Sequence, residues 1–346
     1  MSKAVYIGRF RPFHLGHMSV ILDSYKDLDL SELVILVGSS NKHCSAKNPF
    51  TFQQVKRMIE LSFAHTKMNI NVRSLDDYQS DAKWQTAVRY KAGKDVTHII
   101  GYDKDESSYY LKMFPEWKLH QPTPHMSPTP VQKVLSATDI RDDLLSTQHT
   151  EMTLDQFSAF LPMGTLKFLR QWISSTEYDL MRSEYQSAQA EISKFDSYPY
   201  PQCLNICCSD SVVTCNGMVL LVERKFSPGK GLLALPGGHK DSDETFLDCA
   251  VRELREETRL KIPEKVIRGS LKSEKMFDDP KRSYPHTRVT MAYNFDVAAD
   301  PDGKMPKVKA ADDAASAKWY TLEFVSRNPE LLYDDHRTII EHFTGV

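Results

Sequence analysis

The first half of the chain alternates short β-rich runs with segments of helical periodicity. Four runs predict strands: Ala4–Ile7, Leu33–Val37, Ile70–Leu75 and Val96–Ile100. Between them, the spacing of apolar residues predicts helices over Met18–Tyr25 and Gln53–Phe63. Strand–helix alternation is typical of a parallel sheet covered by helices, and such a sheet binds ligands at the carboxyl ends of its strands.

The pattern changes near the middle of the chain. A polar helical stretch, Glu177–Phe195, leads into the Pro-rich segment Ser197–Gln202, which predicts a linker. Two strands with an Asn-Gly hairpin turn, then two helices, are predicted beyond it: Leu204–Thr214, Met218–Glu223, Glu244–Thr258 and, near the C-terminus, Asp335–Phe343. We therefore expect a Rossmann-like α/β domain over residues 1–180, a helix and linker over 181–202, and an α+β domain over 203–346.

Composition and charge narrow the classes of function. The 346 residues carry a formal net charge of −2, so the chain lacks the basic field that would hold nucleic acid or an anionic membrane. No apolar run approaches the ~20 residues that span a bilayer, and the first residues lack the features of a secretory signal. The six cysteines show no paired CxxC spacing, so we expect reduced thiols and a cytoplasmic location. A homo-oligomer is left open.

A segment rich in glycine, arginine and histidine, Gly8–His17, follows the first predicted strand and opens a helix. Free backbone N–H groups and the helix dipole favour anionic phosphates at such a turn. His14 and His17 are three residues apart, so both imidazoles can face one phosphate chain. Arg9 and Arg11 add fork-shaped donors suited to phosphate oxygens.

This segment, GRFRPFHLGH, resembles the HxGH nucleotidyltransferases, and three further stretches extend the resemblance to nicotinamide-mononucleotide (NMN) adenylyltransferases. Gly38–His43 follows the second strand, Asn48–Thr51 resembles their NPFT element, and Ser136–Arg141 resembles their SxTxxR element. Ser136 or Thr138 would cap a helix there. The resemblance implies attack of the NMN phosphate on the α-phosphorus of ATP, release of pyrophosphate, and Mg²⁺ bridging the phosphate oxygens.

The resemblance also implies roles for individual residues. His14 and His17 would hold ATP phosphates, while Arg141 and Arg11 would support the β/γ side. Trp84 lies where the family places a tryptophan that stacks on nicotinamide, and a buried structural tryptophan is the alternative interpretation. The other residues expected to bind ATP or NMN are Gly8, Arg9, Phe10, Ser39, Asn48, Ser136 and Thr138.

A second motif, between Pro236 and Leu260, resembles the Nudix box, Gx5Ex7REUxEExGU. The positions in register are Gly238, Glu244, Arg252, Glu253, Leu254, Glu256, Glu257 and Leu260. The one departure is Arg259, which stands where the pattern has glycine, and we expect it to alter the turn that ends the helix.

The spacing of the box places Glu253, Glu256 and Glu257 on one face of a helix. Clustered carboxylates need cations, and oxygen ligands favour Mg²⁺ or Mn²⁺, so we expect these residues and Gly238 to form a metal site. Such metals polarise a phosphate and generate a nucleophilic water. On another face, four apolar residues predict packing on a sheet: Leu247, Ala250, Val251 and Leu254.

Two features around the metal carboxylates remain to be assigned. We expect Arg252 to pair with a glutamate of the box such as Glu244, and so to be structural. The base that activates water is left open between a glutamate outside the box and one of Asp312 and Asp313.

The loop Phe277–Ser283 and Arg288 resemble a loop of Nudix domains that handle ADP-ribose, although an ordinary β-connection is the alternative. Phe277 would stack on adenine, and Arg282 or Arg288 would hold phosphate. Relatives commonly have RGR where this chain has His286-Thr-Arg288, so only the last arginine carries over.

Taken together, the two motifs resemble the bifunctional NMN adenylyltransferase/ADP-ribose pyrophosphatase family, which implies ATP, NMN and ADP-ribose as substrates. Four alternatives stay open: a different phosphate acceptor such as a pantetheine or flavin phosphate, an ADP-ribose sensor, hydrolysis of another dinucleotide, and hydrolysis of NAD-capped RNA. The complete set of box glutamates speaks against a sensor. The acidic net charge speaks against RNA.

Overall fold

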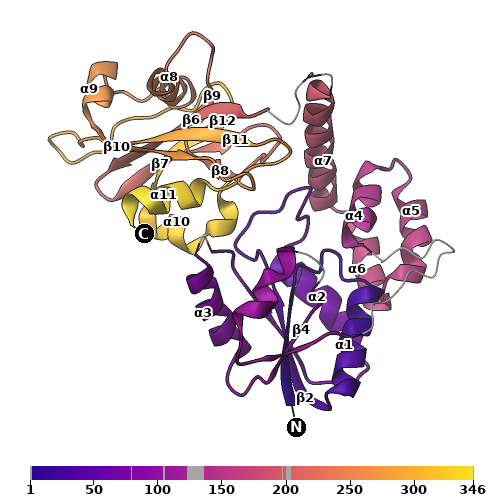
Figure 1. Cartoon of the computed structure of the whole chain (residues 1–346). Coiled ribbons are helices and arrows are strands. Elements are labelled where there is room, and N and C mark those ends of the chain that lie inside the picture. The colour runs from indigo at the N-terminus through magenta and orange to yellow at the C-terminus, as the bar shows by residue number, and fades with distance from the viewer. Residues whose placement is uncertain are drawn as a thin grey trace. The chain divides into compact units, whose positions relative to one another are not determined.

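The computed structural model describes residues 2–78, 80–103, 106–122, 136–196, 198–199 and 204–345. The chain divides into two compact units, residues 1–182 and 183–346 (Figure 1). Helix α7 (Thr176–Phe195), predicted from its polar periodicity, runs across this division. Most of the predicted Pro-rich linker, Ser197–Gln202, lies outside the described residues. None of the described helices is both long and apolar enough to cross a membrane.

The first unit is built on a parallel sheet, as predicted. Its strands are β1 (Ser2–Gly8), β2 (Leu30–Val37), β3 (Ile70–Ser74), β4 (His98–Ile100) and β5 (Lys118–His120). They are hydrogen-bonded in the order β3-β2-β1-β4-β5, and every pair is parallel. The order reverses at β1, which places the turn after this strand at the usual ligand-binding crevice of an open α/β sheet. Strand β5 is short and its residues are exposed or half-buried, so it carries no hydrophobic pattern to predict it from.

Helices cover both faces of this sheet. They are α1 (Leu15–Asp27), α2 (Phe52–Phe63) and α3 (Asp81–Ala92), and Figure 1 shows the sheet nearly edge-on with α3 on one side and α1 and α2 on the other. Alternate residues of the strands bury on the two faces, with Val5 and Ile7 facing the cluster that contains Val88 of α3. A 3-10 helix, Glu106–Met113, adds Leu111 to that cluster.

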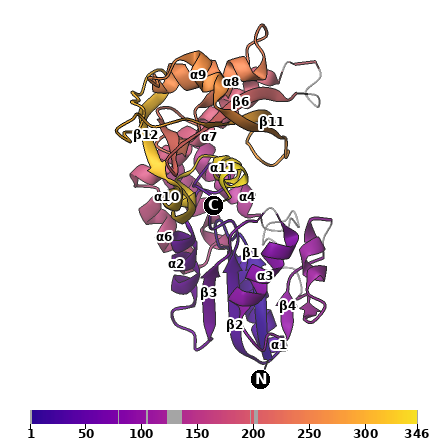
Figure 2. The ribbon, with the colours of Figure 1, turned by 90° about the vertical axis from the view of Figure 1, so that its left-hand side faces the viewer.

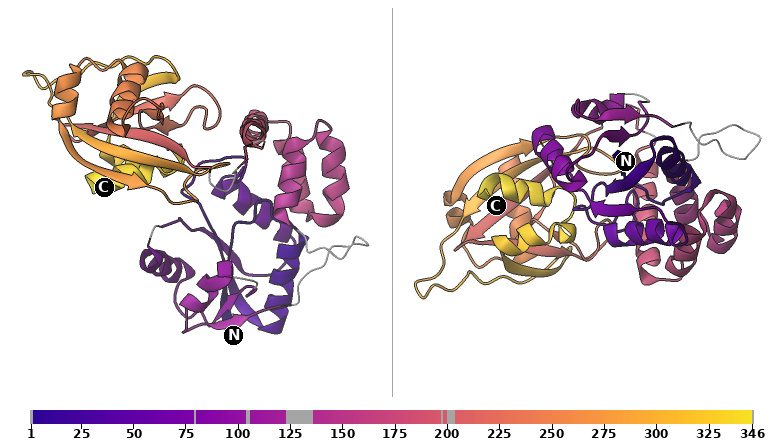
Figure 3. Two further views of the ribbon diagram at one scale, coloured as in Figure 1. Left: turned by 45° about the horizontal axis from the view of Figure 1, so that its top comes forward. Right: turned by 90° about the horizontal axis from the view of Figure 1, so that it is seen from below.

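A helical extension follows the sheet, with α4 (Ala137–Ser146), α5 (Thr150–Gln156) and α6 (Met163–Trp172). Figure 3 shows these helices grouped beside the sheet of the same unit. Helix α6 packs on α2 so closely that a Cβ at Gly164 would overlap the backbone of Leu61 and Ser62. Glycine is therefore required at this helix–helix contact.

The second unit is α+β. Its mixed sheet follows the order β10-β11-β6-β7-β12, with β8 on β7 and β9 on β6. The strands are β6 (Ile206–Cys215), β7 (Met218–Arg224), β8 (Leu233–Ala234), β9 (Gly237–His239), β10 (Leu271–Phe277), β11 (Arg288–Asp296) and β12 (Ala314–Thr321). The predicted hairpin turn is confirmed, because Asn216 and Gly217 join β6 to β7 with φ of 48° and 74°.

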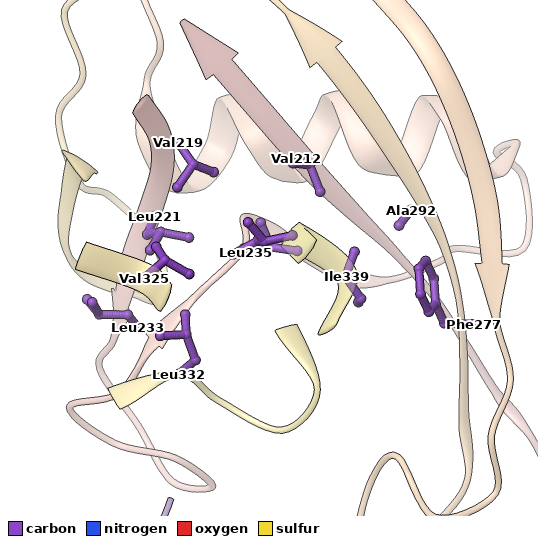
Figure 4. Packing of buried hydrophobic residues seen from close by; sticks show 11 residues of the cluster. Val212, Val219, Leu221, Leu233, Leu235, Phe277, Ala292, Val325, Leu332 and Ile339 are labelled. Carbon is purple, nitrogen blue, oxygen red and sulfur yellow. The ribbon is translucent and has the colours of Figure 1, made fainter. Parts of the chain in front are cut away.

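Helices pack on both faces of this second sheet. They are α8 (Phe246–Thr258), α9 (Glu264–Gly269), α10 (Leu322–Arg327) and α11 (His336–Thr344). Figure 2 shows α8 and α9 on one side of the sheet and α10 and α11 on the other. The core under α11 gathers Val212, Leu221 and Ile339 (Figure 4). Helix α8 begins two residues later than predicted, because the Thr245 hydroxyl caps it by accepting the Asp248 N–H.

Candidate active sites

The turn between β1 and α1 brings the two predicted histidines together. His14 is the N-cap of α1, where its Nδ1 accepts the Gly16 N–H at 3.1 Å. The Nδ1 of His17 in turn accepts the His14 N–H at 3.3 Å. The two imidazoles stack with their centroids 3.7 Å apart. The N-terminus of α1 therefore presents a pair of stacked imidazoles at the positive end of the helix dipole, which suits a phosphate chain.

Arg11 joins this turn to the chain that follows β2. Its guanidinium donates to Asn48 Oδ1 at 3.1 Å and to the carbonyl of Ser39 at 3.3 Å. Only 4% of Arg11 is exposed, and burial lowers its pKa to about 10. The Ser39 hydroxyl donates to Asp77 at 2.8 Å. Three predicted site residues, Arg11, Ser39 and Asn48, thus meet at the carboxyl ends of β1 and β2.

Other predicted site residues of this unit pack against aromatic side chains. The Phe10 ring is 2% exposed and packs edge-on against Tyr6 and Phe13, so its side chain belongs to the core beneath the turn. Gly8 lies against this ring and has no room for a Cβ. Trp84, half-buried on α3, packs with Phe114 at a centroid distance of 5.9 Å.

The SxTxxR element lies at the start of α4. Ser136 is the N-cap, and its hydroxyl accepts the Thr138 N–H at 3.2 Å, so the serine rather than the threonine caps the helix. Arg141 follows one turn later and donates from Nε to Asp142 at 3.2 Å. Arg9 is exposed.

In the second unit, α8 carries the glutamates of the box, and its other face packs on the sheet as predicted. Ala250, Val251 and Leu254 are buried in one cluster, with Leu247 against it. The Ser211 hydroxyl donates to the Ala250 carbonyl at 3.0 Å and joins β6 to the helix. This packing presents the glutamate face of α8 to the cavity described below.

Arg252 connects most of the box. It donates to both carboxylate oxygens of Glu244 at 2.7 and 3.0 Å, which confirms the expected pair and holds the Glu244 pKa at about 2. Its Nη1 also donates to Glu253 at 2.8 Å and to Glu256 at 3.0 Å. A fifth contact reaches the His239 carbonyl at 3.2 Å. The arginine therefore positions three carboxylates and belongs to the framework of the site.

Burial raises the pKa of two carboxylates of the box, Glu257, which is buried, and Glu253, which is half-buried. Glu257 is 8% exposed and accepts the Gly237 N–H at 3.2 Å, and burial raises its pKa to about 8. Burial also raises the pKa of Glu253, although Arg252 opposes it. A Cβ at Gly238 would overlap the Glu253 carboxylate, which explains the glycine at this box position.

The end of α8 departs from expectation. Arg259 adopts the left-handed conformation, with φ of 43°, and its N–H donates to the Arg255 carbonyl at 3.0 Å. This is the helix ending that glycine usually supplies, so the predicted change in the turn is wrong. A non-glycine residue in this conformation adds local strain but leaves the path of the chain intact.

Among the described residues, no three His, Cys, Asp or Glu side chains converge on a common metal position. The reason is local: Arg252 holds Glu253 and Glu256, while Glu257 accepts a backbone N–H. The donors nevertheless fit a hard divalent cation. They are carboxylate oxygens on one helix face, and partial or full burial leaves the negative charge of Glu253 and Glu257 poorly solvated.

A cavity of about 540 Å³ opens at this helix face. It is lined by three glutamates of the box, Glu253, Glu256 and Glu257, by Arg282 and Arg288, and by both aspartates considered as the base, Asp312 and Asp313. The volume is typical of small-molecule sites. The fold thus brings Glu253 of the box together with Asp313, which precedes β12 and lies 60 positions later in the sequence.

The two arginines of the cavity differ in how they are held. Arg282 is 5% exposed and donates to both oxygens of Asp335 at 2.7 and 3.0 Å and to the Arg288 carbonyl at 3.0 Å. Arg288 donates from Nη2 to Glu191 of α7 at 2.7 and 2.9 Å, and its Nη1 is buried without a hydrogen-bond partner. Arg288 therefore keeps a donor for an anionic ligand, and Arg282 is mainly a structural residue.

Phe277 does not line the cavity. Its ring is 9% exposed in the core under α11 (Figure 4). The ring packs edge-on against His342 and Phe343. The expectation that it stacks on adenine is corrected, because β10 directs this side chain inward.

The cavity also contains residues that the sequence did not single out, Phe226 and Glu191 among them. No local sequence pattern predicts Glu191 as a cavity residue, because its partner Arg288 lies 97 residues away. Phe226 could have been predicted, because it is an aromatic residue in the Gly- and Pro-containing loop before the box.

Two family models match this chain: cytidylyltransferase-like over residues 5–143 and the NUDIX domain over residues 209–343. A nicotinamide/nicotinic acid mononucleotide adenylyltransferase of Acinetobacter baylyi is 32% identical over 189 residues, covering 53% of this chain and 93% of that protein. An ADP-ribose pyrophosphatase of Methanocaldococcus jannaschii is 31% identical over 134 residues, covering 39% of this chain and 70% of that protein.

One solved structure matches along almost the whole length. It is a bifunctional NMN adenylyltransferase/ADP ribose pyrophosphatase of Francisella tularensis, crystallised with AMP and a manganese ion. The TM-score is 0.85, the sequence identity is 28%, and the match covers 99% of this chain and 98% of that one. With both halves matched in the same order, the chain belongs to the family of bifunctional NMN adenylyltransferase/ADP-ribose pyrophosphatases.

Proposed function

We propose that the second unit hydrolyses ADP-ribose to AMP and ribose 5-phosphate, and that the first unit transfers AMP from ATP to NMN, giving NAD and pyrophosphate. The observation that supports the hydrolase most strongly is the cavity that brings three box glutamates together with Arg288. Carboxylates for a divalent cation and a guanidinium for phosphate are the two requirements of pyrophosphate cleavage.

In the hydrolase, Glu253, Glu256 and Glu257 would hold Mg²⁺ or Mn²⁺, which polarises the diphosphate and activates a water when bound. Glu253 and Glu256 must first turn from Arg252, which keeps Glu244 as its partner. Arg288 would bind a phosphate oxygen through its unpartnered Nη1 after a small rearrangement, because that atom is buried. Asp312 and Asp313 line the same cavity and remain the candidates for the base.

In the transferase, this chain's residues would position reactants rather than form covalent intermediates. The stacked pair His14 and His17 would bind ATP phosphates beside the N-terminus of α1, where the helix dipole favours negative charge. Arg11 and Arg141 would stabilise the charge that develops on the leaving pyrophosphate. A Mg²⁺ ion bound with ATP would supply further positive charge for the phosphates.

The first test of the hydrolase mixes the full chain with ADP-ribose and Mg²⁺ and follows AMP release. Release by the wild type and its loss in Glu257→Gln would support the assignment. Binding of ADP-ribose without AMP release would refute the hydrolase and leave a sensor. Other dinucleotides, tested in the same assay, would show whether the substrate is a different one.

The transferase is tested with ATP and a panel of phosphate acceptors: NMN, nicotinic acid mononucleotide, and pantetheine and flavin phosphates. We expect pyrophosphate release with pyridine mononucleotides and none with the others. Activity only with a pantetheine or flavin phosphate would overturn the choice of acceptor. A cytoplasmic location is proposed with this function, because ATP and pyridine nucleotides are intracellular metabolites and the described cysteines are unpaired.

A further inference from the structure

Phe226 exposes an aromatic ring at the cavity of the second unit. It lies in the loop that follows β7, is 54% exposed, and lines the same cavity as the box glutamates. A single exposed apolar side chain is ordinary on a protein surface. An exposed aromatic ring beside a proposed phosphate-binding cavity has a further use. A flat ligand that covers the ring gains both apolar burial and stacking.

The loop that carries Phe226 is held firmly. Arg224 donates from Nε to the Pro228 carbonyl at 2.8 Å, and its carbonyl accepts the Gly231 N–H at 2.9 Å. The Gly229 N–H donates to Glu184 at 2.8 Å, and Gly229 lies so close to the Tyr333 ring that a Cβ would not fit. A loop restrained at these points offers a ring that is already in place, so binding costs little ordering of the chain.

Two backbone hydrogen bonds connect this loop, through residues 311–313, to the backbone of α8 at Glu257. The Lys225 N–H donates to the Asp313 carbonyl at 3.1 Å, and the Ala311 N–H donates to the Glu257 carbonyl at 2.9 Å. Phe226 therefore follows the end of β7, whose next residue, Lys225, bonds to residues 311–313. The same three residues bond to α8 at Glu257. The Lys225 ammonium lies 5.0 Å from the Phe226 ring centroid, which adds a positive charge where an anionic nucleotide approaches.

We infer that Phe226 is the nucleobase platform of the hydrolase cavity, the role that Phe277 cannot fill from the core. The inference rests on the proposed hydrolase and names its substrate class: diphosphate compounds that carry a flat base on one side. The base would stack on Phe226 while the diphosphate lies toward the box glutamates and Arg288. Stacking tolerates different bases, so Phe226 provides affinity for a nucleotide rather than a choice of one base.

The test uses the full chain, because inhibition of ADP-ribose hydrolysis reports on this cavity alone. AMP carries the base and ribose 5-phosphate does not, so their inhibition constants separate stacking from phosphate binding. In Phe226→Ala we expect the inhibition constant of AMP and the KM of ADP-ribose to rise by about tenfold to a hundredfold. The inhibition constant of ribose 5-phosphate should stay close to the wild-type value. Phe226→Tyr, which keeps the ring, should retain most of the affinity for AMP.

Val266→Ala is the matched control, because Val266 of α9 is also 54% exposed but does not line the cavity. It should leave both inhibition constants unchanged. An unchanged AMP constant in Phe226→Ala would overturn the platform. Equal weakening of AMP and ribose 5-phosphate would overturn it too, because the loss would then come from the loop as a whole.

Phe226→Trp gives a readout that does not need hydrolysis. The chain contains four other tryptophans, so the fluorescence change on adding AMP is compared between this variant and the wild type. Extra quenching in the variant supports stacking at this position, and its absence contradicts it. If the wild type releases no AMP from ADP-ribose, the proposed function fails, and the fluorescence comparison still decides the role of Phe226.

Discussion

Glu257 should destabilise the second unit near neutral pH when no metal is bound. Burial raises its pKa from 4.5 to about 8, so the folded protein holds this proton more tightly than the unfolded chain does. Stability is then complete below pH 4.5 and falls as the pH rises toward 8. At pH 7 the gap above 4.5 is about 2.5 pH units, and at about 1.4 kcal/mol per unit the cost is about 3 kcal/mol.

Glutamine has the same shape and cannot ionise. In EDTA at pH 7, Glu257→Gln should therefore raise the free energy of unfolding of the second unit by about 3 kcal/mol, or its Tm by about 6–12 °C. The same variant should lose about a hundredfold or more of its hydrolysis of ADP-ribose, because Glu257 is one of the proposed ligands of the divalent cation. If Glu257→Gln is both more stable and inactive, the Glu257 carboxylate contributes to activity at the expense of stability.

The assay is thermal unfolding from pH 4 to pH 8, with EDTA or with Mg²⁺, for the wild type and Glu257→Gln. The two proteins should coincide at pH 4 and separate progressively toward pH 8 in EDTA. Mg²⁺ should stabilise the wild type more than the variant, because it binds the folded carboxylates. A variant that is no more stable than the wild type in EDTA at pH 8 would refute the reasoning about the buried charge.

Three further outcomes follow from other contacts of the second unit. Gly238→Ala should displace the Glu253 carboxylate and lower hydrolysis at least about tenfold in an AMP-release assay, while NAD formation stays unchanged. Asp335→Asn leaves the buried Arg282 charge without its partner and should cost about 3–5 kcal/mol in chemical denaturation. Burial lowers the His336 pKa from 6.5 to about 3, so its neutral ring costs no free energy of unfolding above pH 6.5. At pH 5 the free energy of unfolding should be lower by about 2 kcal/mol. His336→Gln should remove this loss of stability in acid.

The fold was largely predictable because both patterns are local. Strand–helix alternation leads to β1–β4 with α1 and α2, and the box spacing places Glu253, Glu256 and Glu257 on one helix face. The start of α8 was predicted two residues too early. The periodic pattern continues past Thr245, whose hydroxyl caps the first turn.

The site was less predictable because its contacts are long-range. Phe277 and Phe226 are both aromatic residues near turns, and only the direction of β10 separates the buried ring from the exposed one. The pair Glu191–Arg288 joins α7 to β11, which no local pattern indicates. Arg252 was correctly assigned to Glu244, yet its hold on Glu253 and Glu256 depends on the side-chain conformations of the folded helix.

If each unit carries its own proposed nucleotide site, single substitutions should remove the two reactions separately. The most direct test is a single ³¹P NMR time course with ATP, NMN, ADP-ribose and Mg²⁺ present together, for the wild type, His17→Ala and Glu257→Gln. The wild type should form NAD with pyrophosphate and also AMP with ribose 5-phosphate. His17→Ala should keep only the second pair of products, and Glu257→Gln only the first. Loss of both reactions in either variant, or of neither, would contradict the account.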